Sequence, residues 1–548
     1  MKASRSFVTA LLALLFLLPG FLAAQGNTAP IPAIETLLSQ KGLVIEGSPI
    51  LAEQIIYETY SENGFRPLWS RPKFEELMRL IREAPAHGLD PADYDADKLF
   101  TLFTQVLQNP SDMARARVEI MLTESLLRYA YHRRYGKVEA NRIDPDINFR
   151  RETLNNRPVS RNILDALSSS SLETFIDEAA PTGPYYRHLQ EWLGEYREIQ
   201  QRGGWPPVPA GPTLRLGDTD ARVEAIRARM TASGDLVRGP AGNPAYFDQG
   251  LKEAVLVFQE RHFLDADGVV GKASIAAMNV PVEQRIDQLR ISLERLRWVR
   301  GEAADTLVAV NIAQFRASFF KGGELTWSTR AMVGKDYRKT PVFRGDIAYM
   351  EFNPTWTIPP GILRNDTLPA IKRDPNYLAS KNIEVIDNKG RIIDPSTVNW
   401  NQYKTSVPYT LRQTPGPHNS LGTVKFIFPN EHFVFLHDTP HRELFDRPER
   451  AFSSGCVRIE DPLKLAELLL DDPMKYNRSA LKDVVDSRET QRINLKPKVP
   501  VVLVYLTAGL GQVGEVKFVR DVYNRDQRVL DALNGPVVIH LPQNHAAP

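Results

Sequence analysis

The sequence predicts a multidomain α+β protein with a helical N-terminal region, a small three-helix module and a mixed, strand-dominated C-terminal region. The length of 548 residues is enough for two to four domains of ordinary size. The spacing of apolar residues changes along the chain, from steps of three and four before residue 205 to alternation after residue 306, which indicates helices followed by strands. A composition of 43% hydrophobic and 24% charged residues is typical of domains with packed cores.

The N-terminal segment has the residue order of an export signal. Lys2 and Arg5 precede an apolar run over residues 7–18, which Pro19-Gly20 break, and the small residues Ala23 and Ala24 follow Leu22, where a small residue is preferred. This order is typical of a secretory leader, although the run up to Ala24 also reaches the lower length limit of a membrane span. We therefore expect residues 1–24 to be a signal peptide or a membrane anchor, and the rest of the chain to lie outside the cytoplasm.

Residues 34–205 are expected to form a helical scaffold domain. Between Val118 and Tyr129 the apolar residues recur at steps of three and four, as on one face of a helix. The same stretch begins a basic stripe that contains Arg128, Arg133, Arg134 and Lys137. Such a stripe is either a solvated helix face or a contact surface for an anionic polymer.

A linker and a small helical module follow the scaffold. Residues 203–212 are rich in Pro and Gly and therefore form a linker by composition. Within residues 213–280 the apolar positions from Leu251 to Phe258 form a clear helical stripe. We expect this segment to fold as a compact three-helix unit.

One loop of the module has some features of a calcium site. Asp265 and Asp267 are spaced like the first ligands of a calcium-binding loop. The twelfth position counted from Asp265 is Ala276, where a bidentate glutamate should stand. The segment is therefore expected to be a turn.

Residues 305–530 are expected to form a strand-dominated domain. The run from Leu307 to Phe320 alternates like a strand, and Gly322-Gly323 turns it into a second strand at residues 325–327, which is the pattern of a hairpin. Residues 355–413 contain several prolines and show little periodicity. A segment of this length inside a compact domain usually has a function of its own, such as a lid.

The candidate chemistry lies in a pairing of Cys456 with His437. Cys456 is the one cysteine of the chain, so it cannot form a disulfide within the chain and is a dimer bridge, an inert buried residue or a reactive group. It stands in a turn of small residues. His437 ends a buried strand 19 residues earlier, which leaves room for a loop that returns the thiol to the strand end. A thiol becomes a good nucleophile as its thiolate, and a histidine within reach can take the proton and hold an ion pair.

Residues around this pair are expected to support it. Gly455 leaves the backbone open, so N–H groups beside Cys456 can face a developing oxyanion, with Ser454 in the same turn. Arg458 adds a fixed positive charge suited to a substrate carboxylate or to the carbonyls of the turn itself. Asp438 follows His437 directly, but adjacent side chains on a strand diverge, so a backbone carbonyl is an equal candidate for orienting the imidazole.

Several alternatives stay open at this point. His418, His432 and His441 compete with His437 as the base, because spacing alone does not separate them. His437 and His441 have the spacing of two zinc ligands on a helix, but Pro440 between them argues against that helix. The charge balance, 68 basic against 66 acidic residues, lacks the basic excess of a nucleic-acid-binding protein, so no nucleic acid is expected as a partner.

At these residues the sequence resembles a known family. The active-site motif of the L,D-transpeptidases, which have a YkuD-type catalytic domain, is similar to Ser-Ser-Gly-Cys-Val-Arg with Leu-His-Asp-Thr-Pro upstream. Within that family, the chain most resembles the large, multidomain YcbB-like members. Residues 213–280 are similar to the family's peptidoglycan-binding module, and the scaffold motifs around Trp69 and from Arg128 to Gly136 also fit. Further segments that resemble the catalytic domain, in order, are Val333 to Lys335, Thr340 to Phe343, Asn353 to Trp356, Ile358 to Pro360, Gln413 to Pro417 and Asn419 to Gly422.

The resemblance implies a function and a set of roles. Cys456 is then the nucleophile, His437 its base, and residues 355–413 contain a lid that caps the substrate. The implied enzyme is a cysteine acyltransferase of the periplasm that forms 3-3 cross-links between peptidoglycan stem peptides and contributes to cell wall biogenesis and cell shape. Tetrapeptide stems are donor and acceptor, no metal or organic cofactor is needed, and the inner membrane is a further possible partner through residues 1–24.

One departure and two rival functions remain. Many family members have His directly before Gly-Cys, where this chain has Ser454, so a second histidine role is in doubt. One rival function is a cysteine hydrolase, or L,D-carboxypeptidase, that uses water as the acceptor. The other is a non-catalytic wall-binding scaffold in which Cys456 is inert.

Overall fold

The computed structural model describes most of the chain in two compact units. One unit contains residues 1–138, 151–190 and 531–548, and the other contains residues 139–150 and 191–530. The expected leader lies outside the described residues. In the part of the chain that is described, no helix is both long and apolar enough to cross a membrane. The described residues are 29, 31–149, 159–168, 171–179, 181, 183–237, 239, 242–302, 304–511 and 514–537.

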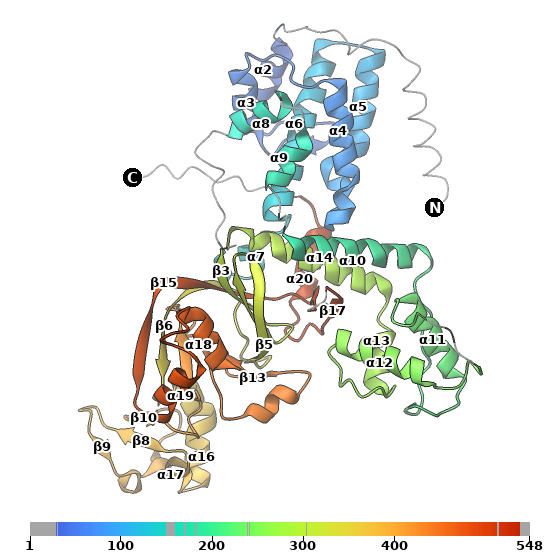
Figure 1. Cartoon of the computed structure of the whole chain (residues 1–548). Coiled ribbons are helices and arrows are strands. Elements are labelled where there is room, and N and C mark those ends of the chain that lie inside the picture. The colour runs from blue at the N-terminus through green and yellow to red at the C-terminus, as the bar shows by residue number, and fades with distance from the viewer. Residues whose placement is uncertain are drawn as a thin grey trace. The chain divides into compact units, whose positions relative to one another are not determined.

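The first unit is built around one long helix, α6 (Asp112–Tyr135), which is buried over most of its length. The Ser111 hydroxyl caps α6 by accepting a hydrogen bond from the Ala114 N–H at 3.1 Å. The predicted apolar face from Val118 to Tyr129 is buried, because other helices surround α6 (Figure 1). The helices that pack against it are α2 (Pro32–Leu38), α3 (Glu53–Glu62), α4 (Arg71–Arg82), α5 (Ala96–Gln108) and α9 (Leu172–Ala179).

Three of the four cations in the basic stripe of this unit are buried and Arg134 is half-buried, which neither expectation for the stripe anticipated. Arg128, Arg133 and Lys137 each expose less than a tenth of their surface. Charged groups are buried when partners compensate them, and here each cation meets an aspartate far away in the sequence. The ion pairs are Arg128–Asp95 at 3.0 Å, Arg133–Asp177 at 2.9 Å and Lys137–Asp93 at 2.7 Å.

The second unit contains the predicted three-helix module. Its helices are α11 (Arg222–Ala232), α12 (Gln249–Arg261) and α13 (Lys272–Met278), and they enclose an apolar core to which Leu251 and Phe258 contribute. The segment with calcium-like spacing is a turn: Asp267 Oδ1 accepts hydrogen bonds from Gln259 Nε2 and from the Val269 N–H, both at 2.9 Å. The helix α14 (Val282–Trp298) follows the module.

The strand-dominated domain is a nine-stranded sheet in the order β13-β5-β14-β12-β11-β6-β15-β3-β4. Because β4 also pairs with β5, the sheet closes on itself. The helical regions and this strand-rich domain confirm the predicted mixed α+β architecture. The strands are β3 (Thr306–Asn311), β4 (Arg316–Lys321), β5 (Glu324–Gly334), β6 (Arg344–Phe352), β11 (Val424–Ile427), β12 (Leu436–His437), β13 (Ala451–Ser453), β14 (Val457–Ile459) and β15 (Gln491–Val504).

The hairpin prediction was right at one turn and missed another. β4 and β5 pair across Gly322-Gly323, as expected. The run from Leu307 to Phe320, however, is two antiparallel strands rather than one. The chain reverses over residues 312–315, where Phe315 has a φ of 52°, and the apolar residues of this turn continue the strand pattern and hide it.

The inserted segment at residues 355–413 is a folded lobe rather than a loop. It contains a four-stranded sheet in the order β7-β10-β8-β9 and a core of its own, to which Ile371, Val385 and Leu411 belong (Figure 1). Its strands are too short for their periodicity to show in the sequence. They are β7 (Trp356–Thr357), β8 (Ile383–Ile386), β9 (Ile392–Ile393) and β10 (Thr410–Gln413), and the longest helix is α16 (Leu368–Arg373).

Candidate active site

Two short parallel strands bring Cys456 and His437 together. In the register of β12 and β14, Leu436 lies opposite Val457 and His437 opposite Arg458. The Val457 N–H donates to the Phe435 carbonyl at 3.1 Å, which extends the pairing toward Cys456. Residues two apart on a strand share a face of the sheet. Cys456 therefore lies opposite Phe435 and diagonal to His437, on the face that both side chains share.

The thiol of Cys456 is half-buried and lies over the chain that enters β12. Its Sγ donates to the Phe433 carbonyl at 3.6 Å. Burial raises the pKa of Cys456 to about 11, although the Phe435 backbone and the positive charge of Arg458 act in the opposite direction. The thiol is therefore protonated at neutral pH.

His437 is buried, with 3% of its surface exposed, and is oriented by backbone. Its Nδ1 lies 2.5 Å from the Asp438 carbonyl oxygen. Because a carbonyl only accepts, the Nδ1 nitrogen carries the hydrogen in this contact, and the Leu421 backbone forms a further hydrogen bond with the imidazole. The Asp438 carboxylate has other partners: it accepts from the Thr423 N–H at 2.9 Å and from Arg442 at 2.8 Å. Asp438 thus supports His437 through its backbone.

The electrostatics of the pair favour two neutral groups. The pKa of His437 is lowered to about 3, first by burial and then by the nearby Arg458 guanidinium, while hydrogen bonds with the Asp438 and Leu421 backbone raise it. Burial thus disfavours the imidazolium and the thiolate alike. Both pKa shifts disfavour the ion pair expected from the sequence, because that pair requires a charged imidazole and an ionised thiol.

The turn before Cys456 is held by side-chain hydrogen bonds. Gly455 has a φ of 119°, which favours glycine. Its N–H donates to Ser453 Oγ at 3.1 Å, and the Ser453 hydroxyl donates to the Cys456 carbonyl at 2.5 Å. The Gly455 N–H is therefore engaged and does not face the cavity as a free donor. The N–H of Cys456 itself has no hydrogen-bond partner among the residues described, so it is the open donor next to the thiol.

Two supporting residues, Thr340 and Tyr523, were missed by sequence reasoning. The Thr340 hydroxyl donates to the Gly455 carbonyl at 2.8 Å and accepts from the Gly334 N–H at 2.9 Å. The Tyr523 hydroxyl donates to the Gly334 carbonyl and accepts from the Thr340 N–H at 3.3 Å. Thr340 falls inside a motif of the resemblance, but nothing in the sequence links Tyr523 to the thiol turn.

Ser454 and Arg458 have different surroundings. Ser454 is exposed, and its hydroxyl accepts from Arg338 at 2.8 Å; Arg338 also forms an ion pair at 2.9 Å with Asp366 of the inserted lobe. Arg458 lies beside His437, and its Nε has no hydrogen-bond partner within the described structure. None of the described residues forms an ion pair with Arg458, and its expected role toward a carboxylate or the turn's carbonyls stays a prediction.

The competing histidines lie apart from β12. His441 is largely exposed and 3.5 Å from Glu443, and His418 is exposed. His432 packs edge-on against Phe343 and lines the same cavity as Cys456. In the part of the chain that the structure describes, no group of three or more His, Cys, Asp or Glu residues could hold a metal ion.

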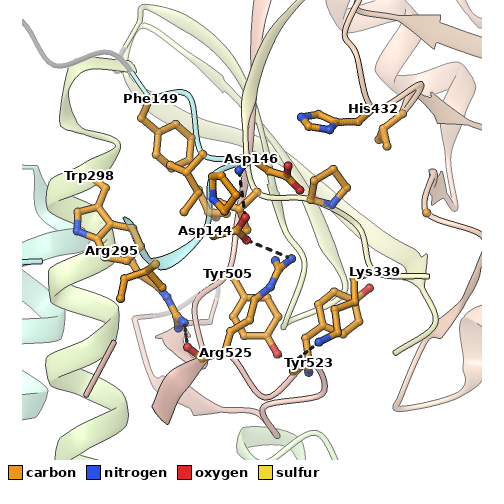
Figure 2. A pocket seen from close by; sticks show the side chains of 18 of the residues that line it. Asp144, Asp146, Phe149, Arg295, Trp298, Lys339, His432, Tyr505, Tyr523 and Arg525 are labelled. Carbon is orange, nitrogen blue, oxygen red and sulfur yellow. Dashed lines mark hydrogen bonds and ion pairs between the residues drawn. The ribbon is translucent and has the colours of Figure 1, made fainter. Parts of the chain in front are cut away.

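A cavity of about 660 Å³ opens beside the thiol. Ser454, Gly455 and Cys456 form part of its wall, and residues 143–149 and 523–529 contribute the opposite parts. Figure 2 shows aromatic rings, among them those of Phe149 and Tyr523, together with charged groups around the space. The thiol therefore borders a volume large enough for part of a peptide.

Comparison with known families divides the chain into three matched segments. Residues 54–193 match a family described as "Scaffold domain", and residues 219–278 match one described as "Putative peptidoglycan binding domain". Residues 305–501, which include Cys456 and His437, match the "L,D-transpeptidase catalytic domain". The predicted limits of 34–205, 213–280 and 305–530 stay predictions.

Individual proteins are similar to parts of the chain. A "Putative L,D-transpeptidase" of Haemophilus influenzae is 34% identical over 222 residues, which are 40% of this chain and 45% of that protein. The amidase CwlM of Mycobacterium tuberculosis is 40% identical over 75 residues, 12% of this chain and 18% of that protein. The chain thus spans less than half the length of these relatives. A solved L,D-transpeptidase structure from Xylanimonas cellulosilytica aligns at 14% identity and a TM-score of 0.17, over 54% of this chain and 98% of that one.

The catalytic-domain match and the Haemophilus relative agree with the motif around the thiol. The peptidoglycan-binding and scaffold matches fit a multidomain member of the same group. Residues 305–501 therefore form a YkuD-type catalytic domain of the L,D-transpeptidase family.

Proposed function

We propose that the protein is a peptidoglycan L,D-transpeptidase that forms 3-3 cross-links through a thioester on Cys456. The observation that carries this proposal is the placement of the Cys456 thiol and the His437 imidazole on one face of two adjacent strands, with the thiol bordering a peptide-sized cavity. The family membership supplies the reaction class, and the peptidoglycan-binding match of residues 219–278 supports the polymer as substrate.

The first step is acylation of the thiol by a donor tetrapeptide stem. Cys456 Sγ forms a bond to the carbonyl carbon of the third residue, and the amide bond to the terminal D-alanine breaks. His437 takes the thiol proton at Nε2 and gives it to the leaving amine, so that free D-alanine departs. The open N–H of Cys456 is placed to stabilise the oxyanion of the tetrahedral intermediate.

The second step transfers the acyl group to an acceptor stem. The side-chain amine of the acceptor's third residue attacks the thioester carbonyl, a new amide bond forms, and the C–S bond breaks. The proton lost by the amine returns to Sγ through His437, which restores the neutral pair. Neither step involves oxidation, reduction or an added cofactor.

The neutral resting pair fits this cycle. With a pKa near 3, His437 is unprotonated throughout the physiological range and is always ready to accept a proton. Because burial disfavours a free thiolate, proton transfer to His437 accompanies the attack of Cys456 on the carbonyl rather than preceding it. The substrate's own developing negative charge is then met by Arg458 and the Cys456 N–H.

The remaining parts of the chain are assigned supporting roles. We propose that the lobe at residues 355–413 caps the donor and keeps water from the thioester, since it reaches the thiol turn through the Asp366–Arg338–Ser454 contacts. Residues 1–24 are proposed to export the protein to the periplasm or to anchor it at the inner membrane. Acting there on the wall, it contributes to wall biogenesis and cell shape.

Product analysis tests the proposal. Wild-type protein incubated with purified disaccharide-tetrapeptide should release D-alanine and yield a cross-linked dimer by mass spectrometry. Cys456→Ala should yield neither while retaining the wild-type circular dichroism spectrum. Unchanged turnover in Cys456→Ala would remove the nucleophile assignment. Release of D-alanine with only trimmed monomer, even at high acceptor concentration, would instead make the protein a hydrolase, and no product with an unreactive thiol would favour a wall-binding scaffold.

An inhibitor gives an independent check on the thiol. The family resemblance leads us to expect one covalent adduct on Cys456 with carbapenem-type β-lactams. Intact-mass spectrometry followed by peptide mapping should locate it, with Cys456→Ala as the matched control. An adduct that persists in Cys456→Ala would contradict the assignment.

A further inference from the structure

We propose that the cavity beside Cys456 binds the acceptor stem, and that Arg528 and Asp146 recognise the carboxylate and the amine which that acceptor carries. This inference rests on the transfer reaction proposed above and adds to it the place and the chemistry of the second substrate. It assigns a function to residues that lie outside the catalytic-domain match at residues 305–501.

The far walls of the cavity come from distant parts of the chain. Residues 143–149 precede the catalytic domain by more than 150 positions, and residues 523–529 follow it. The first of these segments is fixed to the sheet: Asn148 Oδ1 accepts from the Arg344 N–H at 2.8 Å, and Asn148 Nδ2 donates to the Arg344 carbonyl at 3.3 Å. These walls are therefore an ordered part of the unit that contains the thiol.

Most charged groups of the cavity already have partners inside the protein. Figure 2 shows the ion pair between Asp144 and Arg525, at 3.5 Å, on one wall, and the contact of Lys339 with Tyr523 beside it. Such paired groups hold the walls together and have little charge left for a ligand. The internally paired cations are Arg295 with Asp526, Arg338 with Asp366, Lys339 with the Tyr523 carbonyl and Arg525 with Asp144.

Arg528 and Asp146 are different, because each of them lines the cavity without an ionic partner. Both are exposed, and neither forms an ion pair with any residue that the structure describes. They present one free positive and one free negative charge to the same space. A ligand that carries both an amine and a carboxylate complements this pair, and the acceptor stem is such a ligand.

The position of the lobe assigns the cavity to the acceptor rather than the donor. The lobe reaches the thiol turn through Arg338, which contacts Ser454 and Asp366. No residue of 355–413, all of which are described, lines the cavity. The lobe's contact residues Arg338 and Ser454 do belong to the cavity wall. With the donor-capping role proposed above for the lobe, the acyl group on Sγ lies on the lobe's side of the thiol, and the second peptide approaches the thioester from another side. The cavity bordered by Cys456 provides that side.

Separate assays of acylation and transfer test the inference. The variants are Arg528→Gln and Asp146→Asn, and the matched control is Lys482→Gln, an exposed cation outside the cavity. Each cavity variant should raise the acceptor concentration needed for half-maximal transfer about tenfold, the effect of losing one charge-assisted hydrogen bond. D-alanine release from the donor alone should change less than twofold, and Lys482→Gln should match the wild type in both assays.

A modified acceptor identifies which group Arg528 meets. An acceptor with its carboxylate replaced by a carboxamide should transfer about tenfold less efficiently with the wild type, but should lose nothing further with Arg528→Gln. Equal losses in both proteins would overturn the assignment of Arg528. Unchanged transfer in both cavity variants, or a parallel fall in acylation, would overturn the acceptor site while leaving the transpeptidase reaction intact. Absence of D-alanine release from the wild type would remove the proposed function and the acceptor site with it.

Discussion

Glu119 in the helical unit and the Cys456–His437 pair in the strand-dominated domain are both buried titratable sites, but they differ in what their atoms face. Glu119 accepts hydrogen bonds from the Leu68 N–H at 2.8 Å and from the Tyr60 hydroxyl at 2.9 Å, so protein groups surround it. The Cys456 thiol borders a cavity, and His437, whose pKa is lowered to about 3, is a neutral imidazole.

A shifted pKa does not by itself identify a reactive site in this protein. Burial raises the pKa of Glu119 to about 7 and that of Cys456 to about 11, and in each case burial is the largest cause. A shifted pKa alone would therefore select both sites. Only the second combines a nucleophile, an unprotonated nitrogen and an open space for substrate, and chemistry is expected only there.

Replacing His437 should have the largest effect, because the protonated thiol needs a base to react. In His437→Gln we expect the rate of transfer to fall about 10³–10⁴-fold, the upper part of the range for general base catalysis. The measurement is D-alanine release at saturating donor. Glu119→Gln serves as the control for a buried titratable group outside the site, and it should retain the wild-type rate. A fall of less than tenfold in His437→Gln would place the base elsewhere, with His432 as the next candidate.

The pH dependence of thiol alkylation distinguishes a neutral pair from an ion pair. With a Cys456 pKa near 11, the thiolate fraction rises about tenfold per pH unit below that value. The rate constant for iodoacetamide should therefore rise about 10³-fold from pH 7 to pH 10 in the absence of substrate. A plateau across this range would show that an ion pair with His437 exists at rest. The rate should be followed by intact mass at each pH.

Glu119 provides the matching prediction for stability. Its pKa is raised from 4.5 to about 7 in the folded state, so the native protein binds more protons than the unfolded chain between these values. The stabilisation is complete below the unfolded pKa and is lost as the pH rises to about 7, a change of roughly 3 kcal/mol.

Glu119→Gln should remove this dependence. Between pH 5 and pH 8 the free energy of unfolding of the wild-type helical unit should fall by about 3 kcal/mol relative to that of Glu119→Gln. The measurement is the opening free energy obtained from hydrogen exchange of the α6 amides. The two proteins should be similar at pH 5. Parallel pH profiles would mean that Glu119 is ionised in the folded protein at both pH values. The hydrogen bonds from the Leu68 N–H, the Trp69 N–H and the Tyr60 hydroxyl would then lower its pKa more than burial raises it.

Local chemistry was readable from the sequence, whereas long-range pairing was not. Cys456 stood out because it is the one cysteine and lies in a turn of small residues, and the register of β12 and β14 places it beside His437. The partners of Arg128 and of the Gly455 carbonyl lie 33 and 115 residues away in the sequence. No pattern within one segment indicates such contacts, so the burial of Arg128 and the support from Thr340 became visible only in the fold.

Apolar periodicity also failed to predict secondary structure where buried apolar residues lie in a turn or in very short strands. The turn at residues 312–315 continues the alternation of β3 because Ile312, Ala313 and Phe315 are buried in the core. In the inserted lobe the strands have two to four residues, too few for alternation to be recognised. The sequence therefore predicted the class of the domain and the two residues that the strand register brings together, but not the fold of the lobe.

The smallest effect is expected at the exposed edge of the site, where Asp366 of the lobe pairs with Arg338. Solvent-exposed ion pairs usually contribute about 0.2–1 kcal/mol, in contrast to the buried groups compared above. Asp366→Asn should therefore raise the KM for the donor about two- to fivefold and leave kcat nearly unchanged, since Asp366 holds the lobe against the thiol turn but does not line the cavity. Arg364→Gln, which removes an exposed charge from the same part of the lobe, is the matched control and should have no effect. If Asp366→Asn lowers kcat as strongly as it raises KM, the lobe takes part in the chemical step, and the contrast between a reactive buried pair and a merely supporting surface no longer holds.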